Sequence, residues 1–134
     1  MQTFTIGELA KQGGVGIETV RYYERRGLIE PEARTESGYR LYRETSADRL
    51  RFIRRAQSLG FTLGEIADLL RISDSPDAGA ADVKQLTEHK IADIEQRIGD
   101  LRRMRDALSE LAACCPGEGS SEECPILNAL KTQA

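Results

Sequence analysis

One segment, residues 81–112, restricts the architecture of this chain more than any other feature. It contains no proline and only one glycine, and its large apolar residues are spaced by 3, 4, 3 and 7 positions. The apolar positions are Ile91, Ile94, Ile98, Leu101 and Leu108. This spacing predicts a long helix with a coiled-coil seam, which Thr87, Arg105 and Ala112 complete.

A helix of this length cannot bury such a seam by itself. About 30 residues at about 1.5 Å each give a rod of about 45 Å. A second copy of the chain is the natural partner, so the seam predicts a homodimer. The polar residues Thr87 and Arg105 weaken the seam locally and are suited to setting its register.

Two short helices are predicted at the start of the chain. In "TIGELAKQGG", Thr5 is a suitable N-cap and Glu8 completes a capping box. In "GIETVRYYERRG" and the residue after it, Ile17, Val20 and Leu28 are expected to face inward, whereas Thr19, Arg21, Tyr22 and Arg25 remain outside. Two short helices joined by a glycine-containing turn predict a helix-turn-helix.

A β-hairpin is predicted to follow. Pro31 ends the preceding helix, and "RTESGYRLY" alternates around a Ser37-Gly38 turn. Arg34 lies at the entrance of this wing, and Tyr39, Arg40 and Tyr42 lie on its return strand. Arginine and tyrosine on a hairpin and on a helix are suited to contacts with phosphates and groove edges.

Two more helices are predicted before the long one. "SADRLRFIRRAQSLG" has Ser46 as its N-cap and an apolar stripe of Leu50, Ile53 and Leu59. "TLGEIADLLRI" begins after Thr62, with Glu65 in the capping-box position. The predicted fold is mainly α, with a winged helix-turn-helix domain (1–72), a junction (73–80), a dimerisation helix (81–112) and a Cys-containing loop with a short helix (113–134).

Charge divides unevenly along the 134 residues. Residues 1–60 hold 11 Lys/Arg against 8 Asp/Glu, whereas residues 61–134 hold 8 against 14. The basic half is suited to a polyanion. No apolar run approaches 18 residues, and the N-terminus lacks a signal-peptide pattern, so we expect a cytoplasmic protein with no membrane association.

All three cysteines lie in "ELAACCPGEGSSEECPIL". Cys115 and Cys124 flank a polar loop, and a helix beginning at "CPIL" would lower the pKa of a thiol at its N-terminus. Soft thiolates favour Cu(I), Zn(II) and similar ions. Metal sensing is the preferred interpretation, and thiol redox sensing and an inert role are the alternatives. Cys114 is a further candidate ligand, although adjacent side chains diverge.

An enzyme is not expected. The chain has one histidine, no phosphate-binding glycine loop and no Cys-His pair in a recognisable catalytic motif. A metal buffer would leave the basic half unexplained. A DNA-binding regulator accounts for both halves.

The whole chain resembles the MerR family of transcriptional regulators, and specifically its heavy-metal-responsive branch. The resemblance rests on "TIGELAKQGGV", "ETVRYYERRGLI", "RTESGYRLY", "RLRFIRRAQSLGFTLGEIADLL" and "CPGEGSSEECPIL", in this order. It implies a dimer joined by an antiparallel coiled coil, bound to a pseudo-palindromic promoter. It also implies activation by distortion of that promoter, so that RNA polymerase engages both promoter elements.

The resemblance also implies roles for single residues. Arg21, Tyr22 and Tyr23 match the recognition-helix element, with Thr19 beside them. Arg34, Tyr39 and Arg40 match the wing contacts, and Cys115 and Cys124 match the paired metal ligands.

One departure from the family bears on the metal. Sensors of Hg(II), Zn(II), Cd(II) or Pb(II) usually carry a further cysteine where this chain has Ala80. The Cu(I)/Ag(I)/Au(I) branch also lacks it, which favours Cu(I). The spacing from Cys115 to Cys124 equals that of the divalent branch, however, and Hg(II) also accepts two thiolates, so Hg(II) and Zn(II) remain alternatives.

Overall fold

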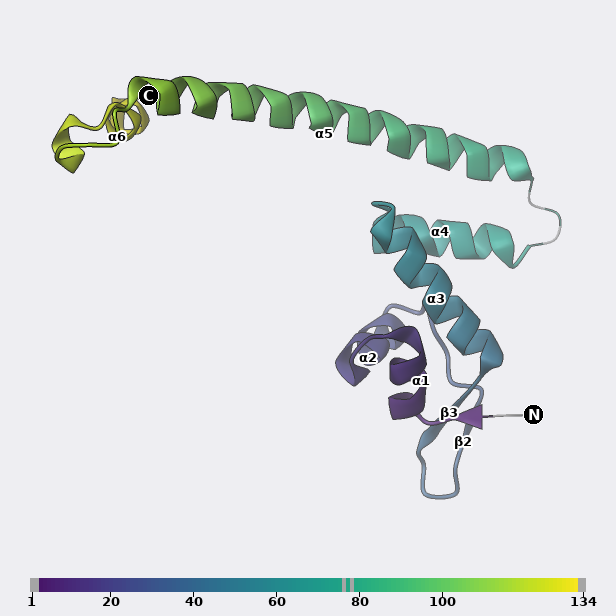
Figure 1. Ribbon diagram of the computed structural model, residues 1–134. Coiled ribbons are helices and arrows are strands. Elements are labelled where there is room, and N and C mark those ends of the chain that lie inside the picture. The colour runs from purple at the N-terminus through teal and green to yellow at the C-terminus, as the bar shows by residue number, and fades with distance from the viewer. Residues whose placement is uncertain (1–2, 76, 78, 133–134) are drawn as a thin grey trace. The chain divides into compact units, whose positions relative to one another are not determined.

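The computed structural model describes residues 3–75, 77 and 79–132, and most of them are helical (Figure 1). The mainly α fold predicted from the sequence is confirmed. The chain divides into two compact units, Met1–Leu86 and Thr87–Ala134, which are described separately. No helix in the described part of the chain is both long enough and apolar enough to cross a membrane.

Helices α1 (Ile6–Gly13) and α2 (Ile17–Arg25) form the predicted helix-turn-helix. Thr5 caps α1 as predicted: its hydroxyl accepts from the Glu8 amide, and the Glu8 carboxylate accepts from the Thr5 amide. Gly14 ends α1 with a φ of 68°, a left-handed conformation that glycine adopts without steric cost. The short turn that leads into α2 begins at this glycine.

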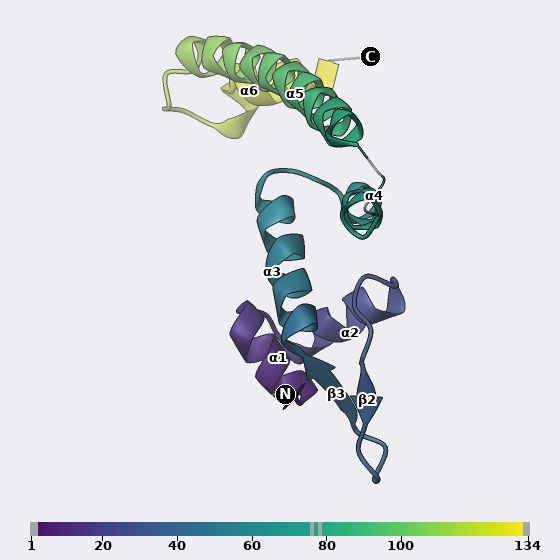
Figure 2. The ribbon, with the colours of Figure 1, turned by 90° about the vertical axis from the view of Figure 1, so that its right-hand side faces the viewer.

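A small antiparallel sheet follows the two helices. Its strands β1 (Thr3–Phe4), β3 (Arg40–Arg43) and β2 (Ala33–Arg34) are arranged in the order β1-β3-β2. Strands β2 and β3 form the predicted hairpin, which extends from the helices in Figure 2. Its turn contains Gly38 at a φ of 90°.

Helices α3 (Glu44–Ser58) and α4 (Leu63–Ser73) complete this unit. The Thr62 cap is confirmed, whereas the Ser46 cap is wrong: α3 begins earlier, and the buried Ser46 hydroxyl donates to the Glu30 carbonyl. Leu59 follows the last turn of α3 and is 60% exposed, so it does not belong to the apolar stripe. Ile17 is 40% exposed and lies outside the hydrophobic core, although it was predicted to face inward.

The hydrophobic core of the first unit lies between its helices and the sheet. Leu9 from α1, Val20 from α2, Tyr42 from β3, Leu50 from α3 and Ile66 from α4 are fully buried. Every helix of this unit and the strands β1 and β3 contribute at least one buried side chain, whereas both residues of β2 are exposed. The hairpin is therefore attached to the core through β3.

The second unit consists of most of α5 and the elements that follow it. Helix α5 runs from Ala80 to Cys114, slightly longer than predicted, and is followed by the 3-10 turn η1 (Ser121–Glu123) and by α6 (Pro125–Thr132). The predicted seam residues Ile91, Ile94 and Ile98 are 40–49% exposed. The domain limits 1–72, 73–80, 81–112 and 113–134 stay a prediction.

Candidate nucleic-acid interface and metal centre

The exposed face of α2 carries a tyrosine surrounded by arginines. The guanidinium carbons of Arg25 and Arg26 lie 5.9 and 5.8 Å from the centre of the Tyr22 ring, within the range of a cation–π interaction. Arg26 Nη1 also donates to the Tyr22 hydroxyl over 3.2 Å. The Tyr22 hydroxyl therefore keeps its own proton for an external acceptor, such as a phosphate oxygen.

Two other predicted residues lie on the same helix. Arg21 Nη1 contacts Glu18 Oε1 at 2.7 Å, and both side chains are exposed. An exposed ion pair of this kind contributes little to stability, so Arg21 is free to exchange Glu18 for a phosphate at small cost. Thr19 is partly exposed on the first turn of α2.

Tyr23 lies in the core rather than on the surface of the recognition helix. It is 3% exposed, and its hydroxyl donates to Gln57 Oε1 of α3 over 2.7 Å. This side chain therefore fixes α2 against α3 and is not available to an external ligand. Two adjacent tyrosines on one helix point in different directions, because successive residues are rotated by about 100°.

Glu24 joins α2 to the wing, and sequence reasoning assigned it no role. Its Oε2 accepts from the Tyr42 hydroxyl at 2.6 Å, and its Oε1 lies 3.0 Å from Arg40 Nε. The pKa of Tyr42 is raised by burial and by this carboxylate. Arg40, predicted to contact DNA, thus also positions the hairpin. The glutamate is the last residue of the motif that contains Arg21, Tyr22 and Tyr23, and this was the available signal.

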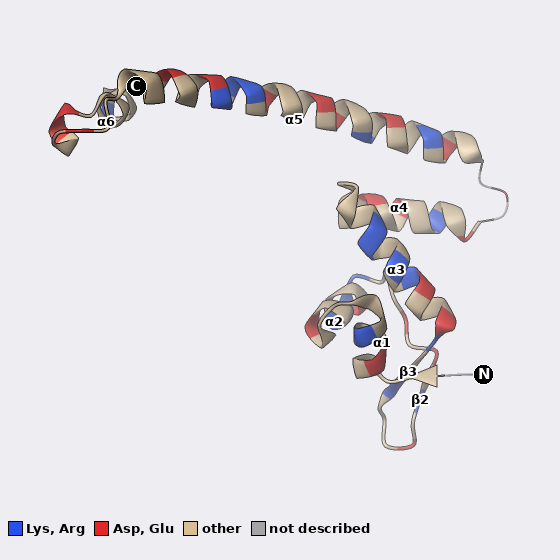
Figure 3. Cartoon of the chain, viewed as in Figure 1, with Lys and Arg blue, Asp and Glu red and all other residues tan. Residues whose placement is uncertain are grey.

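The wing presents its remaining predicted residues to solvent. Tyr39 is 72% exposed, and Arg34 donates through Nη1 to the Gly38 carbonyl at 3.3 Å. The Tyr39 amide donates to the Thr35 hydroxyl, which holds the turn. Lys and Arg occur on α1, α2, α3 and the hairpin of this unit, as Figure 3 shows. The recognition helix and the wing together offer arginine and tyrosine donors on one rigid unit.

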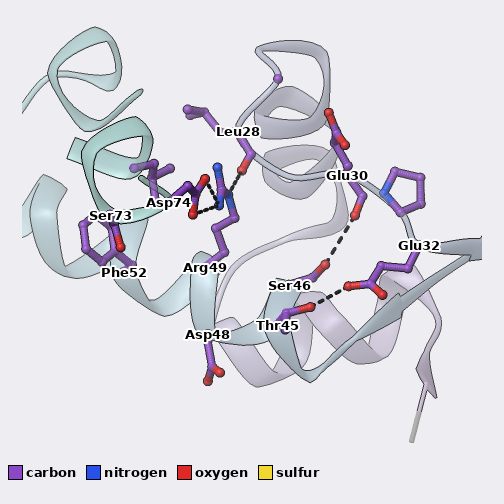
Figure 4. Close-up of a pocket in the computed structure, with 13 residues that line it drawn as sticks. Leu28, Glu30, Glu32, Thr45, Ser46, Asp48, Arg49, Phe52, Ser73 and Asp74 are labelled. Carbon is purple, nitrogen blue, oxygen red and sulfur yellow. Dashed lines mark hydrogen bonds and ion pairs between the residues drawn. The ribbon is translucent and has the colours of Figure 1, made fainter. Parts of the chain in front are cut away.

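A polar cavity beside α3 belongs to the packing of the same unit (Figure 4). Arg49 donates from Nε to the Leu28 carbonyl at 2.7 Å and from Nη1 to the Asp74 carboxylate at 3.0 Å. Thr45 donates to Glu32 on the other side of the cavity. Arg49 thus ties the end of the α2 segment and the C-cap of α4 to α3.

In the second unit, the structure brings together the two cysteines predicted as ligands. Cys115 Sγ and Cys124 Sγ are 3.9 Å apart, and both side chains are partly buried. Cys115 directly follows α5, whereas Cys124 directly precedes α6. The loop between them contains Gly117 and Gly119, both with positive φ, which allow the chain to turn back.

The start of α6 acts on the Cys124 thiol. Hydrogen bonds from the Leu127 and Ile126 amides, with a further one from Cys115, lower its pKa, and burial opposes this shift only in part. Pro125 occupies the first helical position, where its missing N–H is not needed. The predicted effect of a helix N-terminus on this thiol is confirmed, and it favours the thiolate that a soft metal ion requires.

Cys114 differs from the other two thiols because it is exposed. Within the described part of the chain, no group of three or more His, Cys, Asp or Glu side chains is placed to hold a metal ion. Ala80, the first residue of α5, adds no donor atom. One described chain therefore supplies two thiolates, a donor set that fits a thiophilic ion that accepts few ligands.

A helix-turn-helix with a wing, followed by a long helix and a thiol pair, defines a DNA-binding regulator with a separate sensory region. Residues 4–72 match the family model described as "MerR HTH family regulatory protein", and residues 47–111 match "MerR, DNA binding". The chain belongs to the MerR family. Members of this family are transcriptional regulators, so the chain is not an enzyme.

The similar proteins place the chain in the heavy-metal-responsive branch of the family. It is 49% identical to the mercuric resistance operon regulatory protein of Bacillus cereus, over 95% of this chain and 96% of the relative. It is 40% identical to the HTH-type transcriptional regulator CueR of Salmonella typhimurium, over 93% and 90%. The crystal structure of PbrR691 from Ralstonia metallidurans CH34 with lead(II) superposes with a TM-score of 0.84, at 40% identity, covering 93% of this chain and 97% of that one.

Proposed function

We propose that this protein is a homodimeric, metal-responsive transcriptional regulator that activates a promoter when a thiophilic ion binds Cys115 and Cys124. The single observation that carries the proposal is the 3.9 Å separation of these two sulfurs at the end of a long helix. Cys115 and Cys124 are distant in sequence from α2 and the wing, so the proposed metal site is separate from the proposed DNA-binding residues. DNA binding and metal binding are assigned to different units of the chain.

The dimer is proposed from the exposed seam of α5. Ile91, Ile94 and Ile98 leave apolar surface in solvent along one face of the helix. A second α5 in antiparallel orientation would cover this surface on both chains at once. Two identical winged helix-turn-helix units then require a two-fold related DNA site.

The DNA contacts are proposed for the side chains that the structure leaves accessible. Arg21 and Tyr22 on α2 and Arg34 and Tyr39 on the wing would contact phosphates and base edges, with Thr19 beside them and Arg40 at the start of β3. Tyr23 supports α2 from the core. Ion binding would shift the dimer between two states, and distortion of the promoter would let RNA polymerase engage it.

Cu(I), with Ag(I) and Au(I) as chemical analogues, is the preferred effector. At a metal–sulfur distance of about 2.3 Å, a linear two-thiolate ion requires sulfurs about 4.6 Å apart, so the observed 3.9 Å must widen by about 0.7 Å. The absence of a donor at Ala80 supports a two-coordinate ion. Widening of the clamp at the end of α5 is a direct way to convert ion binding into movement.

Hg(II) is the second candidate, and two observations favour it. It also accepts two thiolates in a linear arrangement, and the mercuric relative from Bacillus cereus is 49% identical to this chain. The unchanged separation of 3.9 Å corresponds to an angle of roughly 115° at an ion about 2.3 Å from each sulfur, which suits a three-coordinate ion. A third thiolate would have to come from Cys114 or from the second chain. Zn(II) and Cd(II) require still more ligands than one chain provides.

Metal titration of the reduced protein tests the metal assignment. We expect one Cu(I) or one Hg(II) per Cys115–Cys124 pair, and weaker binding of Zn(II). Cys115→Ser and Cys124→Ser should each abolish metal-induced transcription in vitro while DNA affinity stays within about twofold, because α2 and the wing are unchanged. Cys114→Ser is the matched control and should retain the response.

Two results would contradict the proposal. A metal response that persists in both Cys115→Ser and Cys124→Ser would contradict the assignment of these cysteines as the metal site. Absence of binding to any duplex with a two-fold symmetric site would contradict the proposed regulator function itself.

A further inference from the structure

The Cys115–Cys124 pair has a second chemistry that metal binding does not use. Both thiols are free, partly buried and 3.9 Å apart in one chain. The loop that joins them is short, and its two positive-φ glycines, Gly117 and Gly119, already fold it back. The folded chain therefore already holds the two sulfurs close together, so forming a bond between them requires little further loss of loop entropy.

Binding of a linear two-coordinate ion and oxidation to a disulfide require opposite movements of these sulfurs. A linear ion requires a separation of about 4.6 Å, from two bonds of about 2.3 Å. A disulfide requires about 2 Å. The observed 3.9 Å lies between the two, so the oxidised pair cannot imitate the pair that holds a linear ion.

We propose that Cys115 and Cys124 form an intrachain disulfide when the metal-free protein meets a hydroperoxide, and that this bond excludes the effector ion. The consequence for transcription rests on the proposed metal-responsive function, whereas the disulfide itself does not. Under oxidation the pair could not take up the ion, so the regulator would give no metal response. Metal response would return only after reduction by a cellular dithiol or glutathione.

The chemistry balances with one hydroperoxide per pair. One thiolate attacks the outer peroxide oxygen; the S–O bond forms, the O–O bond breaks, and the alkoxide leaves as an alcohol or as water after protonation. The second thiolate then attacks the sulfur of the resulting sulfenic acid. The S–S bond forms, and the S–O oxygen leaves as water. Two thiols lose two electrons in total, and the peroxide gains them.

The exposed Cys114 provides an internal comparison. It is adjacent to Cys115 in sequence but is exposed, whereas the other two thiols are partly buried. If the distance between sulfurs decides which thiols are oxidised, Cys114 stays a thiol while Cys115 and Cys124 form the disulfide. If solvent exposure decides, Cys114 is oxidised first and forms a disulfide with another chain.

The experiment uses the full-length, reduced, metal-free protein with about one equivalent of hydrogen peroxide. We expect loss of two of the three thiols, a mass decrease of two hydrogens per chain, and a single peptide link between Cys115 and Cys124. Cys114→Ser should lose its two remaining thiols at the same rate. Cys115→Ser and Cys124→Ser should form no intrachain link.

Ag(I) and Hg(II), which peroxide does not oxidise, separate this inference from the proposed function. Preloading either ion should slow disulfide formation by at least about tenfold, because coordination occupies the thiolate lone pair that attacks peroxide. Equal rates with and without ion would overturn the mutual exclusion and the metal site together. Disulfide formation through Cys114, or independent oxidation of all three thiols, would overturn the disulfide proposal and leave the metal site standing.

Discussion

The two units of the chain differ in how far their apolar side chains are buried. In the first unit, 14 hydrophobic residues between Phe4 and Leu70 are buried against one another. In the described part of the chain from Thr87 onward, no hydrophobic side chain is buried, and large ones such as Leu101 and Leu108 are about 60% exposed. The first unit has a hydrophobic core of its own, whereas the second unit has an apolar helix face that no part of the described chain covers.

This difference indicates what holds each unit together. Burial of apolar side chains is the main favourable term in folding, at about 25 cal/mol per Å². The first unit gains this within one chain, so its stability should not depend on protein concentration. The long helix would gain it from the proposed second copy, so its stability should rise with concentration.

The largest expected effect comes from breaking the seam of α5. Ile94→Asp with Ile98→Asp should raise the dimer dissociation constant by more than about 100-fold, or about 2.7 kcal/mol. The cause is that four isoleucines lose their apolar contact and four carboxylates enter the interface. Analytical ultracentrifugation measures the dissociation constant, and a duplex with two half-sites should bind much more weakly.

The matched control places the same two charges away from the seam. Ala92→Asp with Gln96→Asp has the same spacing on exposed positions of α5, so it carries a similar cost in helix propensity. It should leave the dimer intact. If the seam variant dimerises as tightly as this control, the second unit does not depend on a partner copy.

The same contrast explains which parts of the structure could be predicted from the sequence. Periodic patterns and capping residues identified the long helix and the Thr5 and Thr62 caps, because each depends on residues a few positions apart. The buried Tyr23 and the Glu24 contacts with Arg40 and Tyr42 depend on packing between segments distant in sequence. Spacing along the chain contains no information on such contacts.

The Ser46 and Leu59 predictions failed for a related reason. Ser46 has the residue type of an N-cap, but β3 leads directly into α3, and the hydroxyl donates to Glu30 instead. Leu59 fits the helical spacing, but α3 ends at Ser58. Tertiary context decided both, as it often does at helix ends.

The core of the first unit should respond strongly to a single added methyl group. A Cβ at Gly13 would overlap the side chain of Leu50, which is fully buried and cannot move into solvent. Gly13→Ala should therefore destabilise this unit by about 1–3 kcal/mol, although alanine is the better helix former. Urea unfolding followed by circular dichroism measures the change.

Gly64→Ala provides the control of opposite sign. Gly64 lies in α4, and its nearest neighbour to an added Cβ is Thr62 Oγ1 at 3.9 Å, an ordinary contact. This variant should gain about 0.5–1 kcal/mol from helix propensity alone. If both glycine variants shift stability in the same direction, the close packing of α1 on α3 is not what requires Gly13.

The smallest expected effect concerns the link between α2 and the wing. Tyr42→Phe removes the hydrogen bond to Glu24 and should cost about 1.5 kcal/mol at neutral pH. Tyr39→Phe, on the exposed part of the wing, should change stability by less than about 0.5 kcal/mol. The two variants make the same chemical change, once inside the core and once outside it.

The pH dependence of unfolding tests whether the Tyr42 hydroxyl is held in this buried contact. The folded pKa of Tyr42 is raised above the unfolded value of about 10, by burial first and then by Glu24. Its contribution is therefore complete below pH 10 and is lost as the pH rises, because the unfolded state releases the proton first. The parent and Tyr39→Phe should lose stability above pH 10 more steeply than Tyr42→Phe. Equal slopes in all three proteins would show that the Tyr42 hydroxyl is not buried against Glu24 in the folded protein.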